Sequence, residues 1–250
     1  VVFGAKSDKK IEIPLNDTQS LFIRGKIDRI DLLETEKGYH LGIVDYKSSA
    51  QKFDINRLRY GIQLQLLTYL SVARNIVSDQ FKKTVTPYGG LYMHVFQPSF
   101  NAKDLKSDAD FEETRLKKYK LSGLLTNDLG VLQQVQPDFE AGDSIVLPFG
   151  VKKDGEYKAT SQVYAPDDIN LLMDFAFYQL KTAGERILNG ENQIAPFDEL
   201  KEYADSVNGK FSAISMFDAT NPENNYQFLT KIPLQENLTW MRNKIDGKEE

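Results

Sequence analysis

Three side chains in the first hundred residues carry the chemistry that this sequence could perform: Asp28, Asp45 and Lys47. Asp45 and Lys47 end a run of alternating apolar residues typical of a β-strand, so both side chains point to one face, roughly 7 Å apart. Asp28 lies in an earlier strand-like run and supplies a second carboxylate. Two carboxylates, the backbone carbonyl of Tyr46 and water molecules can provide the oxygen ligands of an octahedral Mg²⁺ ion.

This combination predicts metal-assisted cleavage of a phosphodiester bond. A divalent cation makes a water molecule more acidic, polarises a phosphoryl oxygen and neutralises charge on the leaving group. Lys47 is suited to the remaining role, because its point charge can orient the attacking water and stabilise the pentavalent transition state.

A helix that follows these strands adds a third element. Gln65 and Tyr69 lie one helical turn apart, on the stripe that also holds Leu58 and Ile62. The amide of Gln65 and the hydroxyl of Tyr69 therefore lie on the apolar face of the helix, which is expected to be buried. Substrate phosphate or the metal-site carboxylates can act as their hydrogen-bond partners. Gln63 projects to a different face and is the weaker candidate.

Each of these pairs also has a common structural explanation. Taken alone, an Asp and a Lys two residues apart at a strand end are more often a surface ion pair than a reaction centre. A Gln and a Tyr on one helix are more often a satisfied core hydrogen bond. We expect Asp31 to be structural or solvated and His94 to be a packed strand residue. The order of the pieces along the chain favours the chemical interpretation.

A β-hairpin is the element that must bring the two carboxylates together. Residues 11–33 and 39–48 are predicted to form strands, and Glu36-Lys37-Gly38 supplies the turn between them. In such a hairpin Asp28 and Asp45 take neighbouring positions in one sheet.

The remaining elements follow from periodicity and from breaking residues. Residues 56–77 show helical spacing and predict one helix packed on the sheet, whereas the Pro-Tyr-Gly-Gly run at 87–90 is expected to break the chain before a buried strand over 91–96. The chain is predicted to be a single domain over 1–250, with a catalytic core over 1–100, an irregular insertion over 101–165, a helix over 166–190 and a C-terminal extension over 191–250.

The composition limits the class of protein. Of 250 residues, 41% are hydrophobic and 27% charged, as in one sizeable globular domain. No apolar run reaches the ~18 residues of a membrane span, so no membrane association is expected. The absence of cysteine excludes thiolate metal sites, fits a cytoplasmic protein and leaves carboxylate oxygens, which favour Mg²⁺ or Mn²⁺. The net charge of -5 argues against holding nucleic acid mainly by a basic surface.

Three segments, in this order, resemble a known nuclease family. They are Gly25-Lys26-Ile27-Asp28-Arg29-Ile30-Asp31, Asp45-Tyr46-Lys47-Ser48-Ser49 and Gln63-Leu64-Gln65-Leu66-Leu67-Thr68-Tyr69-Leu70. Together they resemble the PD-(D/E)xK (RecB-like) nuclease superfamily. More narrowly, they look like the C-terminal nuclease domain of the AddB/RexB-type subunit of ATP-dependent helicase/deoxyribonuclease.

The resemblance implies a restriction-endonuclease-like α/β fold, with a mixed central β-sheet flanked by helices. It makes Asp28 and Asp45 metal ligands, Lys47 the catalytic lysine, and Gln65 with Tyr69 the helix motif. It also implies a magnesium-dependent DNA exonuclease that resects double-strand breaks for recombinational repair, in a heterodimer with a subunit of the AddA/RexA type. No G-x-x-x-x-G-K-[ST] phosphate loop occurs, so the helicase motor is expected elsewhere.

The sequence departs from the family at two points. Many relatives hold an iron-sulfur cluster through cysteines, but the corresponding positions here are Ser206, Gly209 and Ser215, so no cluster is expected. In this the chain resembles the RexB branch. The family also has an upstream helix that can contribute to the site, and we expect that helix to precede Val1 in a longer parent.

Two other functions are compatible with these residues. A non-catalytic module could keep the nuclease fold for DNA binding or subunit assembly; the net acidity favours this, while Asp28, Asp45 and Lys47 disfavour it. Alternatively, an unrelated α/β domain could carry all three as surface charges. The nuclease hypothesis requires the carboxylates of Asp28 and Asp45 to lie close enough to share a cation.

Overall fold

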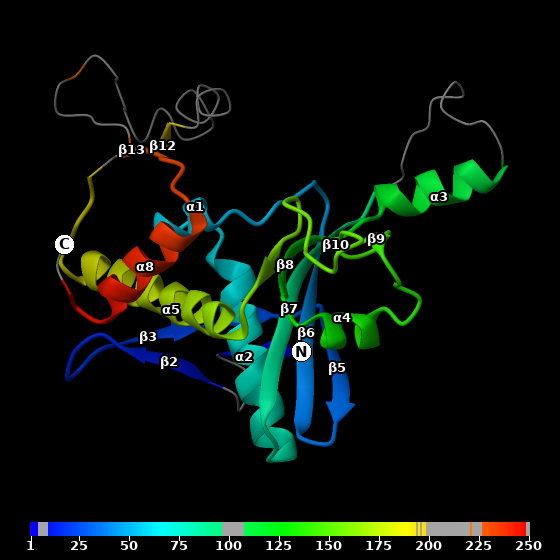
Figure 1. Cartoon of the computed structure of the whole chain (residues 1–250). Helices are drawn as coiled ribbons and strands as arrows, with labels where there is room; N and C mark the ends of the chain where they lie inside the picture. Colours follow the sequence, from blue (N-terminus) through cyan, green and yellow to red (C-terminus); the bar gives the residue numbers. More distant parts are fainter. Residues whose placement is uncertain are drawn as a thin grey trace.

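The computed structural model describes residues 1–4, 10–96, 108–193, 195, 197–198, 221 and 227–248. Its centre is a five-stranded sheet in the order β11-β8-β7-β6-β5 (Figure 1). These strands are β5 (Arg29–Thr35), β6 (Gly38–Lys47), β7 (Val85–His94), β8 (Ser122–Thr126) and β11 (Val163–Tyr164). β6 and β7 pair in parallel, as do β8 and β11, whereas β5–β6 and β7–β8 are antiparallel. The predicted mixed sheet with flanking helices is therefore confirmed.

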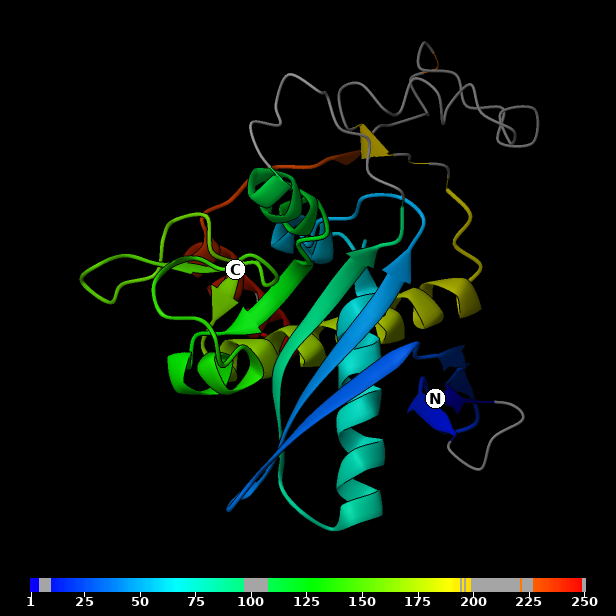
Figure 2. The ribbon, with the colours of Figure 1, turned by 90° about the vertical axis from the view of Figure 1, so that its right-hand side faces the viewer.

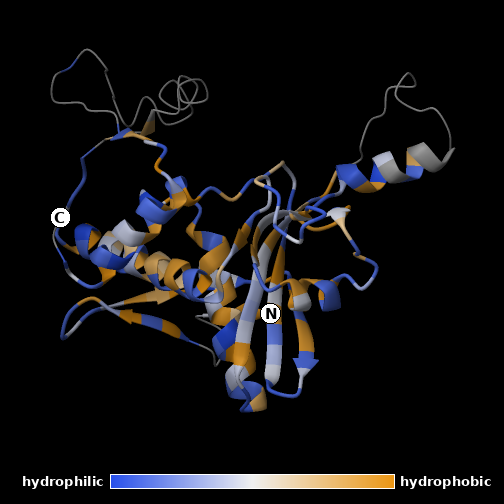
Figure 3. Cartoon of the chain, viewed as in Figure 1, coloured by the Kyte–Doolittle hydropathy of each residue, from blue (hydrophilic) through white to orange (hydrophobic). Residues whose placement is uncertain are grey.

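One face of the sheet is covered by helices that form the larger hydrophobic core. The helices on this side are α1 (Ile55–Arg59), α2 (Leu64–Phe81), α5 (Pro166–Leu188) and α8 (Leu234–Ile245). α2 lies against the sheet, and α5 runs across it (Figure 2). Leu41 and Ile43 of β6 pack with Leu66 of α2 and Met173 of α5, all fully buried. Figure 3 shows apolar residues along α5 and the central strands, where these elements meet.

The opposite face of the sheet holds a second, smaller core. It is covered by α4 (Leu129–Val135), β9 (Gly142–Asp143) and β10 (Gly150–Val151). Val44 and Leu91 of the sheet pack there with Leu132 and Phe149. Because strand side chains alternate, Ile43 and Val44 enter different cores. The side-chain parity of β6 is thereby fixed over its whole length.

The hairpin of β5 and β6 is confirmed, but the prediction of one strand over 11–33 is wrong. That segment forms β2 (Ile11–Pro14), β3 (Ser20–Ile23), β4 (Gly25–Lys26) and β5. β2 pairs with β3 because the chain reverses between them, where Asn16 Oδ1 accepts a hydrogen bond from the Thr18 amide at 3.0 Å. β4 pairs with β1 (Val2–Phe3). Asp28 lies at a bend between β4 and β5.

The prediction of a single helix over 56–77 is also wrong, since α1 and α2 are separate. α1 begins after Asp54, whose Oδ1 accepts a hydrogen bond from the Asn56 amide at 2.9 Å. The chain then turns through positive φ angles of 75° at Gly61 and 62° at Gln63, a conformation that no helix interior contains. Leu58, on α1, therefore does not share a helical stripe with Gln65.

β7 starts earlier than predicted and passes through the expected break at 87–90. A register shift opposite Leu41 and Gly42 leaves Tyr88 as an extra residue in β7, so Pro87 lies at a β-bulge. β8 joins β7 only from Gly89 onward. The missing N–H of Pro87 is tolerated because it lies at a bulge, before the strand is paired on both sides.

The segment over 101–165, expected to be irregular, supplies two strands of the central sheet, β8 and β11. It also contains α3 (Asp108–Lys118) and α4. The helix expected over 166–190 corresponds to α5, which opens with Pro166 in its first turn. β12 (Phe197–Asp198) and β13 (Gln227–Phe228) form a small parallel pair. None of the helices in the described part of the chain has the length and apolar character needed to cross a membrane.

Candidate active site

Asp45 and Lys47 extend the core-facing side of β6 to the strand end. Leu41 and Ile43 point under α2, and the alternation places the next two residues of that face at Asp45 and Lys47. Asp45 is only 5% exposed, although it is a carboxylate. Its Oδ2 lies 2.6 Å from Nζ of Lys47, which is partly exposed. The predicted shared face of these two side chains is confirmed.

Asp28 lies beside the end of β6, as the hairpin requires. The β5–β6 ladder begins with the pair Arg29 and Val44, so Asp28 is adjacent to the next positions on β6. Its Oδ2 accepts a hydrogen bond from the backbone amide of Tyr46 at 3.2 Å. Asp28 is exposed to solvent, whereas Asp45 is buried. The two carboxylates thus belong to one strand end with different access to water.

Gln65 reaches this centre from the first turn of α2. Its Oε1 accepts a hydrogen bond from Nζ of Lys47 at 2.6 Å. Gln63 makes other contacts, since its Oε1 accepts from the Asp54 amide at 3.1 Å and its Nε2 donates to the Lys52 carbonyl at 2.9 Å. Gln63 therefore holds the turn between α1 and α2, and Gln65 contacts the lysine.

Tyr69 lies one turn further along α2 and faces the N-terminal strands. Its ring packs edge-on against Phe3, with centroids 5.7 Å apart. Its hydroxyl is close to Gly25, where an added Cβ would come within 2.9 Å of the oxygen. Within the described residues the structure shows no contact between Tyr69 and Asp45 or Lys47. It brings together four of the predicted side chains and places Tyr69 at their border.

The oxygen atoms at this strand end are of the kind that divalent cations such as Mg²⁺ bind. Oδ2 of Asp45 is buried, and among the described residues it lies 2.6 Å from the ammonium of Lys47. A buried carboxylate oxygen in this state is a ready ligand for a cation. No group of three or more His, Asp or Glu side chains suited to a metal occurs in the described ranges. Two carboxylates therefore need backbone or water oxygens to complete the shell.

Tyr92 is a member of this centre that the sequence did not indicate. It pairs with Asp45 across the parallel β6–β7 ladder, and its ring lies 5.8 Å below Nζ of Lys47. Burial, aided by the negative charge of Asp45, raises the pKa of Tyr92 to about 12. Its hydroxyl is therefore protonated at neutral pH. The apolar pattern predicted a strand here, but the register that pairs these residues is set by tertiary packing.

Asp31 was expected to be structural or solvated and His94 to be a packed strand residue, and the structure agrees with both expectations. Oδ1 of Asp31 lies 2.7 Å from Nε of Arg29, in an ion pair open to solvent. His94 is the register partner of Lys47 on β7, and its Nε2 lies 3.2 Å from the Ser48 carbonyl oxygen. The positions Ser206, Gly209 and Ser215 lie outside the described residues.

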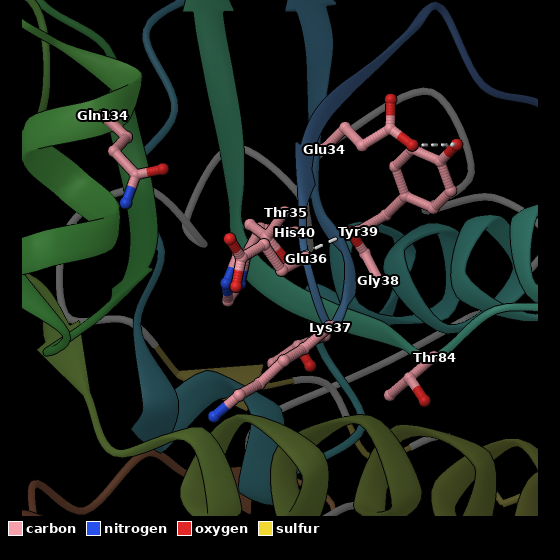
Figure 4. A pocket seen from close by; sticks show the side chains of 10 residues that line it. Glu34, Thr35, Glu36, Lys37, Gly38, Tyr39, His40, Thr84 and Gln134 are labelled. Carbon is pink, nitrogen blue, oxygen red and sulfur yellow. Dashed lines mark hydrogen bonds between the residues drawn. The ribbon is translucent and has the colours of Figure 1, made fainter.

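A pocket of 740 Å³ lies at the other end of β6, around the hairpin turn (Figure 4). Glu34 and Tyr39 form one wall, joined by a hydrogen bond of 3.2 Å from the tyrosine hydroxyl. His40, at the start of β6, and Gln134 of α4 line it as well. The pocket is separated from Lys47 by the length of the strand. The centre that holds Asp45 and Lys47 is instead at the opposite end of β6, where Asp28 is exposed to solvent.

Comparison with known proteins agrees with this geometry. Residues 3–199 match the PD-(D/E)XK nuclease superfamily. The chain is 31% identical over 247 residues to the B subunit of an ATP-dependent helicase/deoxyribonuclease from Bacillus thuringiensis (strain Al Hakam), covering 98% of the chain and 21% of that protein. The chain is 34% identical over 239 residues to the protein of the same name in Lysinibacillus sphaericus (strain C3-41). That match covers 94% of the chain and 20% of the relative.

The chain thus spans about a fifth of the length of these relatives. The matched region contains the whole of the centre described above, from Asp28 to Tyr92. The mixed sheet, the two carboxylates and the lysine at one strand end agree with the match. This chain belongs to the PD-(D/E)XK nuclease superfamily, as a domain homologous to part of the helicase/deoxyribonuclease B subunit.

Proposed function

We propose that this chain is a metal-dependent deoxyribonuclease domain whose centre is formed by Asp28, Asp45 and Lys47. One observation carries the proposal: the buried carboxylate of Asp45 lies 2.6 Å from the Lys47 ammonium, at the strand end where Asp28 accepts a hydrogen bond from the Tyr46 amide.

Asp28, Asp45 and the backbone carbonyl of Tyr46 would hold Mg²⁺, and Mn²⁺ offers a similar preference for oxygen ligands. The ion would supply acidification of a water molecule and charge neutralisation at the phosphoryl group. The Tyr46 amide fixes Asp28 by donating to its Oδ2, so this carboxylate is oriented in advance. Burial between the sheet and α2 restricts Asp45 in the same way.

Lys47 acts on the substrate and Gln65 acts through Lys47. The lysine ammonium has two acceptors, Asp45 Oδ2 and Gln65 Oε1, both at 2.6 Å. If Asp45 bound a cation, the side-chain amide of Gln65 would still hold the lysine ammonium in place. Lys47 can then orient the attacking water and stabilise charge on the phosphate. Tyr69, at the border of the centre, is proposed to contact substrate rather than the reacting atoms.

The name of the relatives suggests the larger setting. They are described as B subunits of an ATP-dependent helicase/deoxyribonuclease. We propose that this domain is the DNA exonuclease of such a helicase-nuclease complex, that it works in the cytoplasm with a subunit of the AddA/RexA type, and that it resects double-strand breaks for recombinational repair. Because the chain has no cysteine, we expect no iron-sulfur cluster.

The test is cleavage of end-labelled single- and double-stranded DNA with Mg²⁺ or Mn²⁺, and with chelator. Asp45→Asn and Lys47→Met should each abolish metal-dependent loss of label, while both variants stay folded. Asp31→Asn is the matched control, since that carboxylate lies on the neighbouring strand but is paired with Arg29 in solvent. Cleavage unchanged by both variants, or absence of any Mg²⁺ binding in calorimetry, would refute the proposal.

A further inference from the structure

The segment between β6 and α1, residues 48–54, starts directly after Lys47 and contains no helix or strand. It passes over the end of β7 and the start of β8 before it reaches α1 (Figure 2). We call this segment the crossing loop. A segment without secondary structure must find partners for its backbone groups elsewhere, and those partners decide how firmly it is held.

Side chains from two other elements hold the crossing loop at its ends. At its start, Nε2 of His94 on β7 lies 3.2 Å from the Ser48 carbonyl oxygen. Near its end, Gln63 donates to the Lys52 carbonyl at 2.9 Å and accepts from the Asp54 amide at 3.1 Å. The loop is therefore tied to β7 on one side and to the residue that precedes α2 on the other.

Ser122, the first residue of β8, holds the middle of the crossing loop. Its hydroxyl donates a hydrogen bond to the Gln51 carbonyl, 71 residues earlier in the chain. Among the described residues, no other side chain from outside the loop bonds to residues 49–51. Phe53 is already buried in the larger core, so the part of the loop nearest Lys47 depends on Ser122.

The sheet places Ser122 in the same row as the proposed centre. Ser122 pairs with Tyr92 across β7 and β8, and Tyr92 pairs with Asp45 across β6 and β7. Side chains of residues that pair directly across strands lie on one face of the sheet. Leu124, two residues after Ser122, is buried in the larger core on this face. Ser122 therefore continues on β8 the face that carries Asp45 and Lys47 on β6.

Lys47 is the residue that a movement of the crossing loop would displace. Its ammonium lies 2.6 Å from both Asp45 Oδ2 and Gln65 Oε1, and its side-chain stem is flexible. The backbone beyond Lys47 is the loop itself. Gln65 is in the first turn of α2, whose start is bonded to the far end of the loop through Gln63. One loop thus connects both partners of the Lys47–Gln65 hydrogen bond, and Ser122 fixes its middle.

We propose that Ser122 is a positioning residue for this centre: through the Gln51 carbonyl it holds the crossing loop, and through the loop it holds the Lys47 ammonium. The proposal rests on the proposed nuclease function for what Lys47 does there. Ser122 lies outside all three motif segments, in the part of the chain over 101–165. It gives that part of the chain a role in the reaction, without contact with the substrate.

Steady-state cleavage of end-labelled DNA with Mg²⁺ tests the proposal. Ser122→Ala should lower kcat by about threefold to tenfold, the loss expected when one hydrogen bond of ordinary strength is removed. The KM for DNA should change little, because the hydroxyl is bonded to Gln51 and not to DNA. Ser122→Thr should restore kcat, since the hydroxyl is present again. If Ser122→Ala does not fold, Ser122→Cys decides the same question, because a thiol is only a weak donor.

Ser161→Ala is the matched control. The Ser161 hydroxyl also donates to a backbone carbonyl, that of Gly150 at 3.0 Å, but Gly150 belongs to β10, over the opposite face of the sheet. This variant should leave kcat and KM unchanged. A merely structural role of Ser122 would lower the thermal stability of both variants and leave kcat unchanged in both.

A second measurement follows the position of the ammonium without any cleavage. Hydrogen bonds slow the exchange of ammonium protons with water, and ¹⁵N NMR measures this exchange for Lys47, whose signal is assigned by its loss in Lys47→Met. The exchange should become severalfold faster in Ser122→Ala and stay unchanged in Ser161→Ala.

Failure of this inference is distinguishable from failure of the nuclease proposal. Unchanged ammonium exchange in Ser122→Ala, or an unchanged kcat in a chain that Asp45→Asn inactivates, would refute the role of Ser122. If exchange becomes faster in Ser122→Ala but Asp45→Asn leaves cleavage unchanged, Ser122 does position Lys47 and the proposed catalytic centre is wrong.

Discussion

Lys47 and Gln65 are joined by a hydrogen bond of 2.6 Å between the end of β6 and the first turn of α2. The turn between α1 and α2 makes this contact possible, because Gln63 closes that turn through Asp54 and Lys52 and so sets where α2 begins. The same lysine is ion-paired with Asp45. The position of its ammonium thus depends on both a strand and a helix.

Gln65→Leu should therefore lower the rate of cleavage without abolishing it. A hydrogen bond to a charged group is worth about 1.5 to 3 kcal/mol, and the partial exposure of this one favours the lower value, or about a tenfold loss in kcat. The KM for DNA should change little, because the amide is proposed to position Lys47 and not the substrate. Steady-state kinetics on single-stranded DNA measures both constants. A change in KM alone would mean that Gln65 contacts DNA instead.

Lys47→Met should reduce the free energy of unfolding, since it leaves the carboxylate of Asp45 buried without a counter-charge. We expect a loss of about 1 to 3 kcal/mol in urea unfolding, below the value for fully buried pairs because the lysine is partly exposed. The double variant Asp45→Asn/Lys47→Met should recover part of the lost free energy of unfolding, because the buried charge is removed as well. Added Mg²⁺ should also stabilise the single variant by binding the folded state. Equal stability of the variant and the unchanged chain would contradict this account.

Gly42→Ala should destabilise the sheet because a Cβ at this position would overlap with the ring of Tyr88. Tyr88 is the extra residue of the bulge in β7 and is only 3% exposed, so it has little room to move. Overpacking of this kind costs about 1 to 3 kcal/mol. Gly130→Ala, in α4, is the matched control, since its φ is not positive and the nearest atom to its added Cβ is Oδ1 of Asp128 at 3.3 Å. Similar losses at both glycines would argue against the overlap.

The stability of the fold should fall between pH 10 and pH 12, in part through Tyr92. Its pKa is raised to about 12, first by burial and then by Asp45, whereas an unfolded tyrosine ionises near pH 10. The proton is therefore retained in the folded state and lost in the unfolded state over this window, which lowers the free energy of unfolding by up to roughly 1.4 kcal/mol per pH unit. Below pH 10 Tyr92 is protonated in both the folded and the unfolded state, so the stability no longer depends on its ionisation.

Urea unfolding of Tyr92→Phe across this pH range measures that contribution. The variant should show a shallower decline than the unchanged chain. Tyr164→Phe should behave in the same way, because burial and Asp54 raise the pKa of Tyr164 to about 12 as well. Parallel pH profiles for all three proteins would show that neither hydroxyl is protected by the fold.

The sequence was sufficient for the parts of the site that depend on local periodicity. Alternation along β6 predicted that Asp45 and Lys47 share a face, and the short turn after β5 predicted that Asp28 lies beside them. Both were correct because a two-residue period and a hairpin leave one arrangement for neighbouring strands. The roles assigned to these residues in catalysis stay predictions.

The sequence was insufficient where long-range packing overrides local preference. Pro87 suggested a chain break, but the bulge at Tyr88 accommodates it within β7. The periodicity placed Gln63 inside one continuous helix, but its backbone is left-handed, and this residue ends the turn that precedes α2. The partnership of Tyr92 with Asp45 depends on the register of a parallel pair, which no turn sets. In the same way, β11 is added to the sheet from far along the chain.

Every residue of the proposed centre lies between Asp28 and Tyr92, although the sheet around it also contains β11 from residues Val163–Tyr164. The hairpin and the crossover through α2 close short loops, and the entropy lost on closing a loop grows with its length. The contacts that build the centre are therefore low in contact order, the property that accompanies fast folding. During synthesis this stretch leaves the ribosome before the edge strand does, so the reaction centre can take shape ahead of the sheet that finally encloses it.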